Sequence, residues 1–323
     1  MKRVSFALLA AVCLALFAQP ALAANQQKVS DAIHGGQQWI INKQLGDGSW
    51  SDSRYGNPNT STAFAVAALL ETGVSWQYTG ITRGIQYIMD HAVDRGGGLI
   101  ELGSQDGEQN YAHNSCLLAL ALYAAQADNV PITLTNLING AKLFTESYQV
   151  NNPGSSCHGS WGYDRWDNCG DNSNTQFAVM GLWYANRFLG VSSATEPWAT
   201  ANYAWLQYTF RDLGSGRGSF GYTSPWTYGT MTGSGLWQLA MIGKSDDPMV
   251  TAAANWFSYT PNYLWSGVPS PFYASPTTAY YYFIYAMAKA LTATVGAQNL
   301  LGPEQRPWTT DLVNEMVDNK AIW

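Results

Sequence analysis

The residues that could do chemistry gather in polar loops that precede apolar helical segments. Paired carboxylates beside Tyr or His can act as general acid and base on a glycosidic or uronic linkage when burial raises the pKa of one of them. The loops also supply Asp106, His158, Asp167 and Tyr273. The predicted site residues are the catalytic groups Asp164, Asp171 and His113 and the ligand-binding groups Trp166, Tyr163, Tyr111, Glu108, Tyr228 and Trp226.

The same residue types also have structural uses, and these alternatives stay open. Asp171 and Asn172 stand directly before an apolar helical segment, where Asp and Asn commonly cap helices. His113, at the head of another such segment, could carry a proton or be a hydrogen-bonded cap. Three aromatic residues fall at equivalent places in successive loops, which favours packing between neighbouring units: Trp50, Trp161 and Phe220.

The elements that position these loops form a repeat. Amphipathic segments alternate with segments that are apolar on every side, and Gly-rich loops such as Gly96–Gln109 and Gly214–Thr227 separate them. The apolar helices should begin near residues 61, 112, 174, 230 and 277, a period of about 50. Because such helices need cover on both sides, a closed ring is favoured over an open solenoid. We predict an all-α fold, an α/α toroid of about five to six helical hairpins with the long loops on one face.

The N-terminus predicts export. A basic start, an apolar stretch from Val4 to Phe17 and an Ala-x-Ala site are typical of a secretory signal peptide cut after Ala23. A membrane anchor would need roughly 20 unbroken apolar residues, so we predict no membrane span after cleavage. The expected organisation is a signal peptide over 1–23 and a single toroid domain over 24–323, located in the periplasm or outside the cell.

The composition of the chain limits the kinds of molecule that the protein is expected to bind. Removal of Lys2 and Arg3 leaves 14 basic against 22 acidic residues, a formal charge of −8 with no basic run, so nucleic acid is a poor partner. The 14 Trp and 19 Tyr residues indicate an aromatic core or an aromatic-lined pocket. In an exported chain, Cys157 and Cys169 are expected to form a disulfide, while Cys116 is expected to be a buried, inert thiol.

Three segments resemble a known superfamily. Gln44 to Trp50 resembles the Gln-Trp motif of terpenoid cyclases, and Thr60 to Gly73 and Asp171 to Gly190 resemble the inner-helix segments of prenyltransferase and squalene-cyclase repeats. The resemblance covers nearly the whole mature chain at the level of the repeat, and it implies a toroid with loops over one mouth of a central cavity. It does not extend to the cyclase activity, because the sequence has no Asp-x-Asp-Asp or Asp-Asp-x-x-Asp motif.

Two further similarities concern reactive groups. Zinc-dependent prenyltransferases hold their metal with Asp-x-Cys and His, to which Asp167, Cys169 and His113 are similar in type. Here the order of the motifs is reversed and Cys169 has a disulfide partner, so we predict no metal and no cofactor. Gly107–Asn110 looks like the end of a thioester motif, but Asp106 stands where that motif needs cysteine.

Three functions follow as hypotheses. The preferred one is an exported toroid protein that binds a small-molecule ligand, isoprenoid-like or glycan, in an aromatic-lined central cavity. The first alternative is a secreted carbohydrate-active enzyme, a glycoside hydrolase or polysaccharide lyase that uses loop carboxylates. The second alternative is a protein-interaction module without a pocket.

Overall fold

The fold is mostly helical. The computed structural model describes residues 23–51, 58–103, 108–259, 280–297 and 299–318; Asp106, Tyr273 and the predicted signal peptide up to residue 22 lie outside them. The mostly helical class predicted from the sequence is confirmed. The helices are α2 (Ala23–Asn42), α3 (Pro58–Glu71), α4 (Thr79–Asp90), α5 (Gln109–Gln126), α6 (Ile132–Ser147), α7 (Asn172–Leu189), the short η2 (Ser193–Thr195), α8 (Pro197–Thr209), α9 (Gly229–Met241), α10 (Pro248–Ser258), α11 (Tyr280–Thr294) and α12 (Trp308–Asp318).

Several helices are buried on nearly every side, as their apolar sequences predict. Every residue is buried over 112–122 in α5, over 172–182 in α7 and over 229–239 in α9. By contrast, α2 is mostly exposed, and Trp39 at its outer face is 64% accessible. Since apolar area removed from water is the main favourable term in folding, the burial of these helices contributes to the stability of the fold.

The described chain divides into two compact units that interleave in sequence. The first unit takes residues 1–148, 163–166 and 180–192, and the second takes 149–162, 167–179 and 193–323. In the first unit α3 packs against α5, and in the second α9 packs against α11. The short segment Tyr163–Trp166 therefore belongs with helices that precede it by about 50 residues, although its chain neighbours on both sides belong to the second unit.

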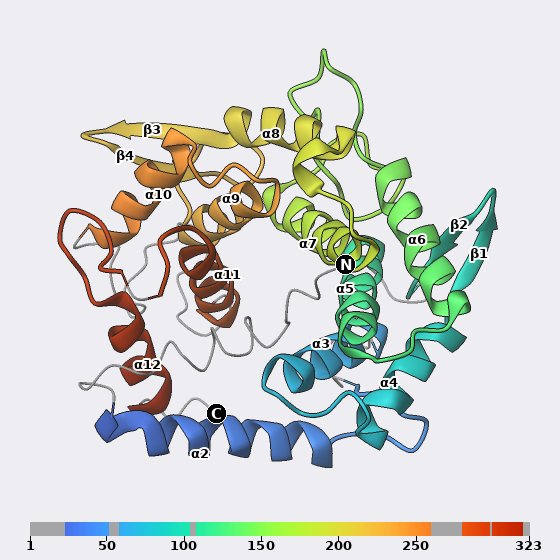
Figure 1. Cartoon of the computed structure of the whole chain (residues 1–323). Helices are drawn as coiled ribbons and strands as arrows, with labels where there is room; N and C mark the ends of the chain where they lie inside the picture. The colour runs from blue at the N-terminus through green and yellow to red at the C-terminus, as the bar shows by residue number, and fades with distance from the viewer. Residues whose placement is uncertain (1–22, 52–57, 104–107, 260–279, 298, 319–323) are drawn as a thin grey trace. The chain divides into compact units, whose positions relative to one another are not determined.

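Two short β-hairpins stand where the sequence suggests Gly-rich loops, so the all-α prediction is wrong in this detail. They pair β1 (Val93–Gly96) with β2 (Leu99–Glu101) and β3 (Phe210–Gly214) with β4 (Arg217–Phe220), both antiparallel. The first turn needs positive φ at three consecutive residues, 83°, 63° and 84° at positions 96–98, and all three are glycine. The β1–β2 hairpin lies beside α6, and β4 packs on α10 (Figure 1).

A repeated hydrogen bond ties four loops to the helices that follow them. A backbone N–H in the loop donates to a side chain in the first turns of the buried helix. In three repeats that side chain is threonine, and in one it is histidine. The pairs are Trp50 to Thr62 Oγ1 (2.9 Å), Leu102 to His113 Nδ1 (2.9 Å), Trp161 to Thr175 Oγ1 (3.1 Å) and Phe220 to Thr232 Oγ1 (3.2 Å).

A second repeated contact involves the first turn of the buried helices. The backbone N–H of Asn110 donates to the Tyr163 carbonyl at 2.9 Å, and that of Asn172 donates to the Tyr222 carbonyl at 2.8 Å. Tyr163 and Tyr222 both follow a loop aromatic residue by two positions. In these two places the backbone contacts repeat with the period seen in the sequence.

Candidate functional site

The segment Tyr163–Trp166 lies on the N-terminal turn of α5. Its Tyr163 carbonyl accepts from the Asn110 N–H, and its Arg165 N–H donates to Gln109 Oε1 at 3.1 Å. Asp164 Oδ1 accepts from the Trp166 N–H at 2.7 Å, which closes a turn within the segment. The Tyr111 and Tyr163 rings lie with their centroids 5.9 Å apart. The structure thus brings together four of the predicted site residues.

We call Tyr111, Tyr163 and Trp166 the aromatic surface. Tyr163 is 41% accessible and Trp166 is 74% accessible, so both rings face solvent. The Arg165 guanidinium carbon lies 4.5 Å from the centroid of the Trp166 ring, a cation–π contact that leaves Trp166 largely uncovered. Two carboxylates, Asp164 within the segment and the exposed Glu108 at the start of α5, add hydrogen-bond acceptors to the same part of the unit.

Beneath this surface is a buried carboxylate that the sequence did not reveal. Glu101, at the end of β2, is completely buried and forms an ion pair with Arg95 of the same hairpin. Gln109 Nε2 donates to the second oxygen of that carboxylate, while Gln109 Oε1 faces Arg165. Because the Arg165 N–H can only donate, the amide orientation of Gln109 follows from its partners. A Glu and a Gln eight residues apart, in a Gly-rich stretch, have no helical or strand spacing that would have linked them.

His113 is completely buried and has hydrogen-bond partners on both ring nitrogens. Nδ1 accepts from the Leu102 N–H, so Nε2 is the protonated nitrogen and donates toward the Ala141 carbonyl (3.1 Å) and Thr145 Oγ1 (3.0 Å). Burial lowers the pKa of His113 from 6.5 to about 4, although the Glu101 carboxylate acts in the opposite direction. The ring is therefore a neutral structural link in this arrangement, and its predicted catalytic role stays a prediction.

The Asp171 carboxylate caps the N-terminus of α7. Oδ1 accepts from the backbone N–H groups of Ser173 (2.8 Å) and Asn174 (2.9 Å), and Oδ2 accepts from Asn174 Nδ2 at 2.8 Å. These bonds satisfy two of the free donors in the first turn of α7 and place negative charge at the positive end of the helix. The structural alternative considered for Asp171 is confirmed, and no catalytic use of it follows from the geometry.

The buried side chain of Asn172 joins several segments by hydrogen bonds, whereas the sequence suggested only that it caps a helix. Its Nδ2 donates to the Gly221 carbonyl (2.7 Å) and to Thr209 Oγ1 (3.0 Å), while its Oδ1 accepts from Trp205 Nε1 at 2.9 Å. One side chain therefore connects α7, α8 and the loop after β4. Such a role depends on contacts with distant segments and leaves no local pattern in the sequence.

The remaining predicted residues lie in the second unit. Trp226 is 64% accessible, and the Arg211 guanidinium carbon lies 5.8 Å from the centroid of its ring. Tyr228 is half-buried, and its carbonyl accepts from the Thr232 N–H at 2.8 Å in the first turn of α9. These two residues and Asp171 belong to one compact unit, while Glu108, Tyr111, His113 and the segment Tyr163–Trp166 belong to the other.

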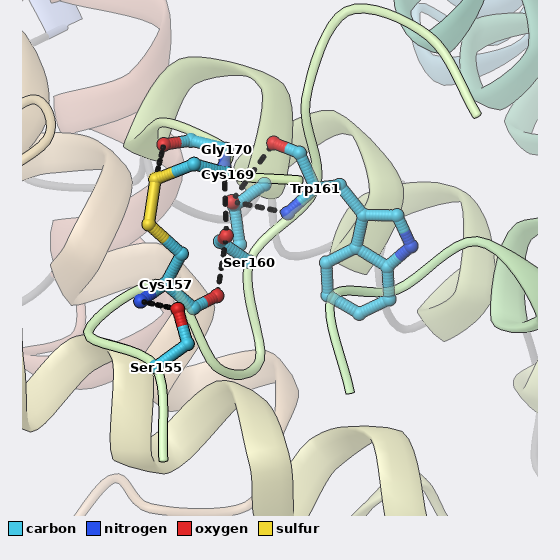
Figure 2. The surroundings of a disulfide bond; sticks show 7 residues. Ser155, Cys157, Ser160, Trp161, Cys169 and Gly170 are labelled. Carbon is cyan, nitrogen blue, oxygen red and sulfur yellow. Dashed lines mark hydrogen bonds between the residues drawn. A yellow bond between two sulfur atoms is a disulfide. The ribbon is translucent and has the colours of Figure 1, made fainter. Parts of the chain in front are cut away.

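The predicted disulfide between Cys157 and Cys169 is present (Figure 2). Ser160 lies between its two ends: its Oγ donates to the Cys157 carbonyl at 2.7 Å and accepts from the Gly170 N–H at 3.0 Å. The adjoining Trp161 is fully buried, as its expected packing role requires. The bond removes Cys169 from the set of zinc ligands considered above, and the described residues contain no group of three His, Cys, Asp or Glu able to hold a metal. Cys116 is buried and forms no disulfide, and its Sγ donates to the Asn59 carbonyl at 3.7 Å.

Comparison with protein-family models, with curated proteins and with solved structures finds no match to this chain. Among the described residues, no helix is both long and apolar enough to cross a membrane.

Proposed function

We propose that the chain is an exported α/α-toroid protein, related to the terpenoid cyclase and prenyltransferase repeats, that binds a glycan at the aromatic surface. The observation that supports this function best is the pair of solvent-facing rings, Tyr163 and Trp166, held on the N-terminal turn of α5, with Asp164 between them in the chain and Glu108 directly before the helix. The repeated loop-to-helix hydrogen bonds support the toroid. The Cys157–Cys169 disulfide and the N-terminal leader pattern support export to the periplasm or beyond.

The chemistry of the surface fits a sugar. A pyranose ring has an apolar C–H face, which packs on a flat aromatic ring, and hydroxyl groups at its edge, which donate to carboxylates. Tyr and Trp combine large apolar faces with a polar group, and Asp164 and Glu108 offer carboxylate oxygens nearby. An isoprenoid chain offers no hydroxyls for these acceptors and is best bound by an enclosed apolar pocket. The open, mixed character of the aromatic surface therefore favours a glycan over an isoprenoid.

The test is a titration of the mature protein with a panel of oligosaccharides and isoprenoids, followed by Trp fluorescence. We expect saturable quenching by one or more oligosaccharides and an affinity at least about tenfold lower in Trp166→Ala, since one stacked ring accounts for roughly 1.4 kcal/mol at that ratio. The matched control is Trp39→Ala, which removes another exposed ring from the same unit, 64% accessible, and should bind as the wild type does.

Three outcomes would change the proposal. Saturation by isoprenoids alone would replace the glycan with an apolar ligand. A lack of response to every ligand in the panel would reject glycan binding at the aromatic surface and leave the protein-interaction module as the better hypothesis. Release of new reducing ends from a bound oligosaccharide would favour the carbohydrate-active enzyme, with Asp164 and Glu108 as the carboxylates to replace first.

A further inference from the structure

The segment that bears Trp166 is attached by hydrogen bonds to the start of α5. Trp166 is 74% accessible, and its backbone N–H donates to Asp164 within the segment. Two hydrogen bonds that join the segment to α5 run from the Asn110 N–H to the Tyr163 carbonyl and from the Arg165 N–H to Gln109 Oε1. The second of these is adjacent to Trp166 and depends on a side chain.

Gln109 is itself held in place by the buried carboxylate below it. Glu101 is completely buried, and a buried carboxylate needs donors to offset its lost hydration. Arg95 supplies a charged donor to one oxygen, and Gln109 Nε2 supplies a donor to the other. Hydrogen bonds to a charged group are the stronger kind, so the bond to Glu101 holds the Gln109 amide in the orientation that faces Arg165.

We propose that Gln109 is the positioning residue of the aromatic surface, linking the buried Arg95–Glu101 pair of the β1–β2 hairpin to the backbone of Arg165. This inference rests on the proposed glycan binding for its functional meaning. The amide presents a preorganised acceptor to the Arg165 N–H, so the neighbouring Trp166 ring is ordered before a ligand arrives. Ordering a binding group in advance improves affinity because less conformational entropy is lost on binding.

The decisive variant is Gln109→Lys. A lysine ammonium can still donate to Glu101, so the buried carboxylate keeps a partner, but it has no acceptor for the Arg165 N–H. Gln109→Leu removes both bonds and serves as a second variant. The matched control is Gln126→Leu, the same change at the other end of the same helix.

The first readout needs no ligand. In Gln109→Lys we expect the amide hydrogen of Arg165 to exchange at least about tenfold faster than in the wild type, while the interior of α5 exchanges at its wild-type rate. Gln126→Leu should leave Arg165 exchange unchanged. Unchanged Arg165 exchange in both Gln109 variants would overturn the proposal, whether or not the protein binds a glycan.

The second readout is the oligosaccharide titration. We expect Gln109→Lys to weaken binding about tenfold without changing the denaturation midpoint, and Gln126→Leu to bind normally. Faster Arg165 exchange combined with unchanged affinity would also overturn the positioning role. If the wild type binds no glycan but the exchange result holds, then the glycan proposal fails while the structural link through Gln109 stands.

Discussion

The buried neutral His113 should make the stability of the protein depend on pH. Its pKa in the folded state is about 4, against 6.5 for an ordinary histidine, because burial disfavours the charged ring. Above pH 6.5 neither the folded nor the unfolded state protonates this ring, so its contribution to stability is fully present. As pH falls from 6.5 toward 4, the unfolded state takes up a proton that the folded state does not, and stability is lost.

The size of the effect follows from the two pKa values. Linkage gives a loss of about 2 kcal/mol at pH 5 relative to pH 7.5, rising to roughly 3 kcal/mol once the pH is below the folded pKa. The hydrogen bond from the Leu102 N–H to His113 Nδ1 also disfavours the protonated ring in the folded state. Protonation of Nδ1 would place two donors face to face.

The best comparison variant is His113→Thr, because threonine makes the equivalent loop contact at Thr62, Thr175 and Thr232. We expect it to be less stable than the wild type at pH 7.5, since the His113 ring packs on Phe144 with centroids 5.0 Å apart. Between pH 7.5 and pH 5, the free energy of unfolding of His113→Thr should fall by about 2 kcal/mol less than that of the wild type.

Urea denaturation at the two pH values measures this difference, and NMR of ¹⁵N-labelled histidine reports the ring directly. The spectrum should show His113 as the Nε2–H tautomer, unchanged from pH 7.5 to 5. His34→Gln, a change at an exposed histidine, is the control. Equal loss of stability in wild type and His113→Thr, or a His113 signal that titrates near pH 6.5, would refute the reasoning.

Two further predictions concern residues 157–171, which precede α7. Replacing both Cys157 and Cys169 with Ser should lower the free energy of unfolding by about 3 kcal/mol, the loop-closure entropy for a sequence separation of 12, as measured by denaturation; a loss under about 1 kcal/mol would contradict it. Asp171→Ala should cost about 1–2 kcal/mol in the same assay, because two backbone donors of α7 lose their acceptor. Asp171→Asn keeps an acceptor oxygen and should cost less, so equal losses in the two variants would argue against capping.

Much of the helical pattern could be predicted because it is local. Helices that are apolar on every side must be buried, and α5, α7 and α9 are. The Cys157–Cys169 pairing and the burial of Trp161 also followed from residue type and position. The hairpins were missed because a run of glycines indicates a turn but does not show whether the flanking residues will pair. Closure of the helices into a toroid stays a prediction.

In the candidate site, too, some residues could be predicted from the sequence and others could not. Residue type alone indicated Tyr163, Asp164 and Trp166, since aromatic rings and a carboxylate in a polar loop suit ligand recognition whatever surrounds them. Whether Asp171 and His113 are reactive or structural could not be decided locally, because the answer depends on burial and on partners such as Leu102. Only the tertiary structure placed Gln109 between Glu101 and Arg165, which is 56 residues further along the chain. A contact at that separation is set by how helices and loops pack, and no periodicity in the sequence encodes it.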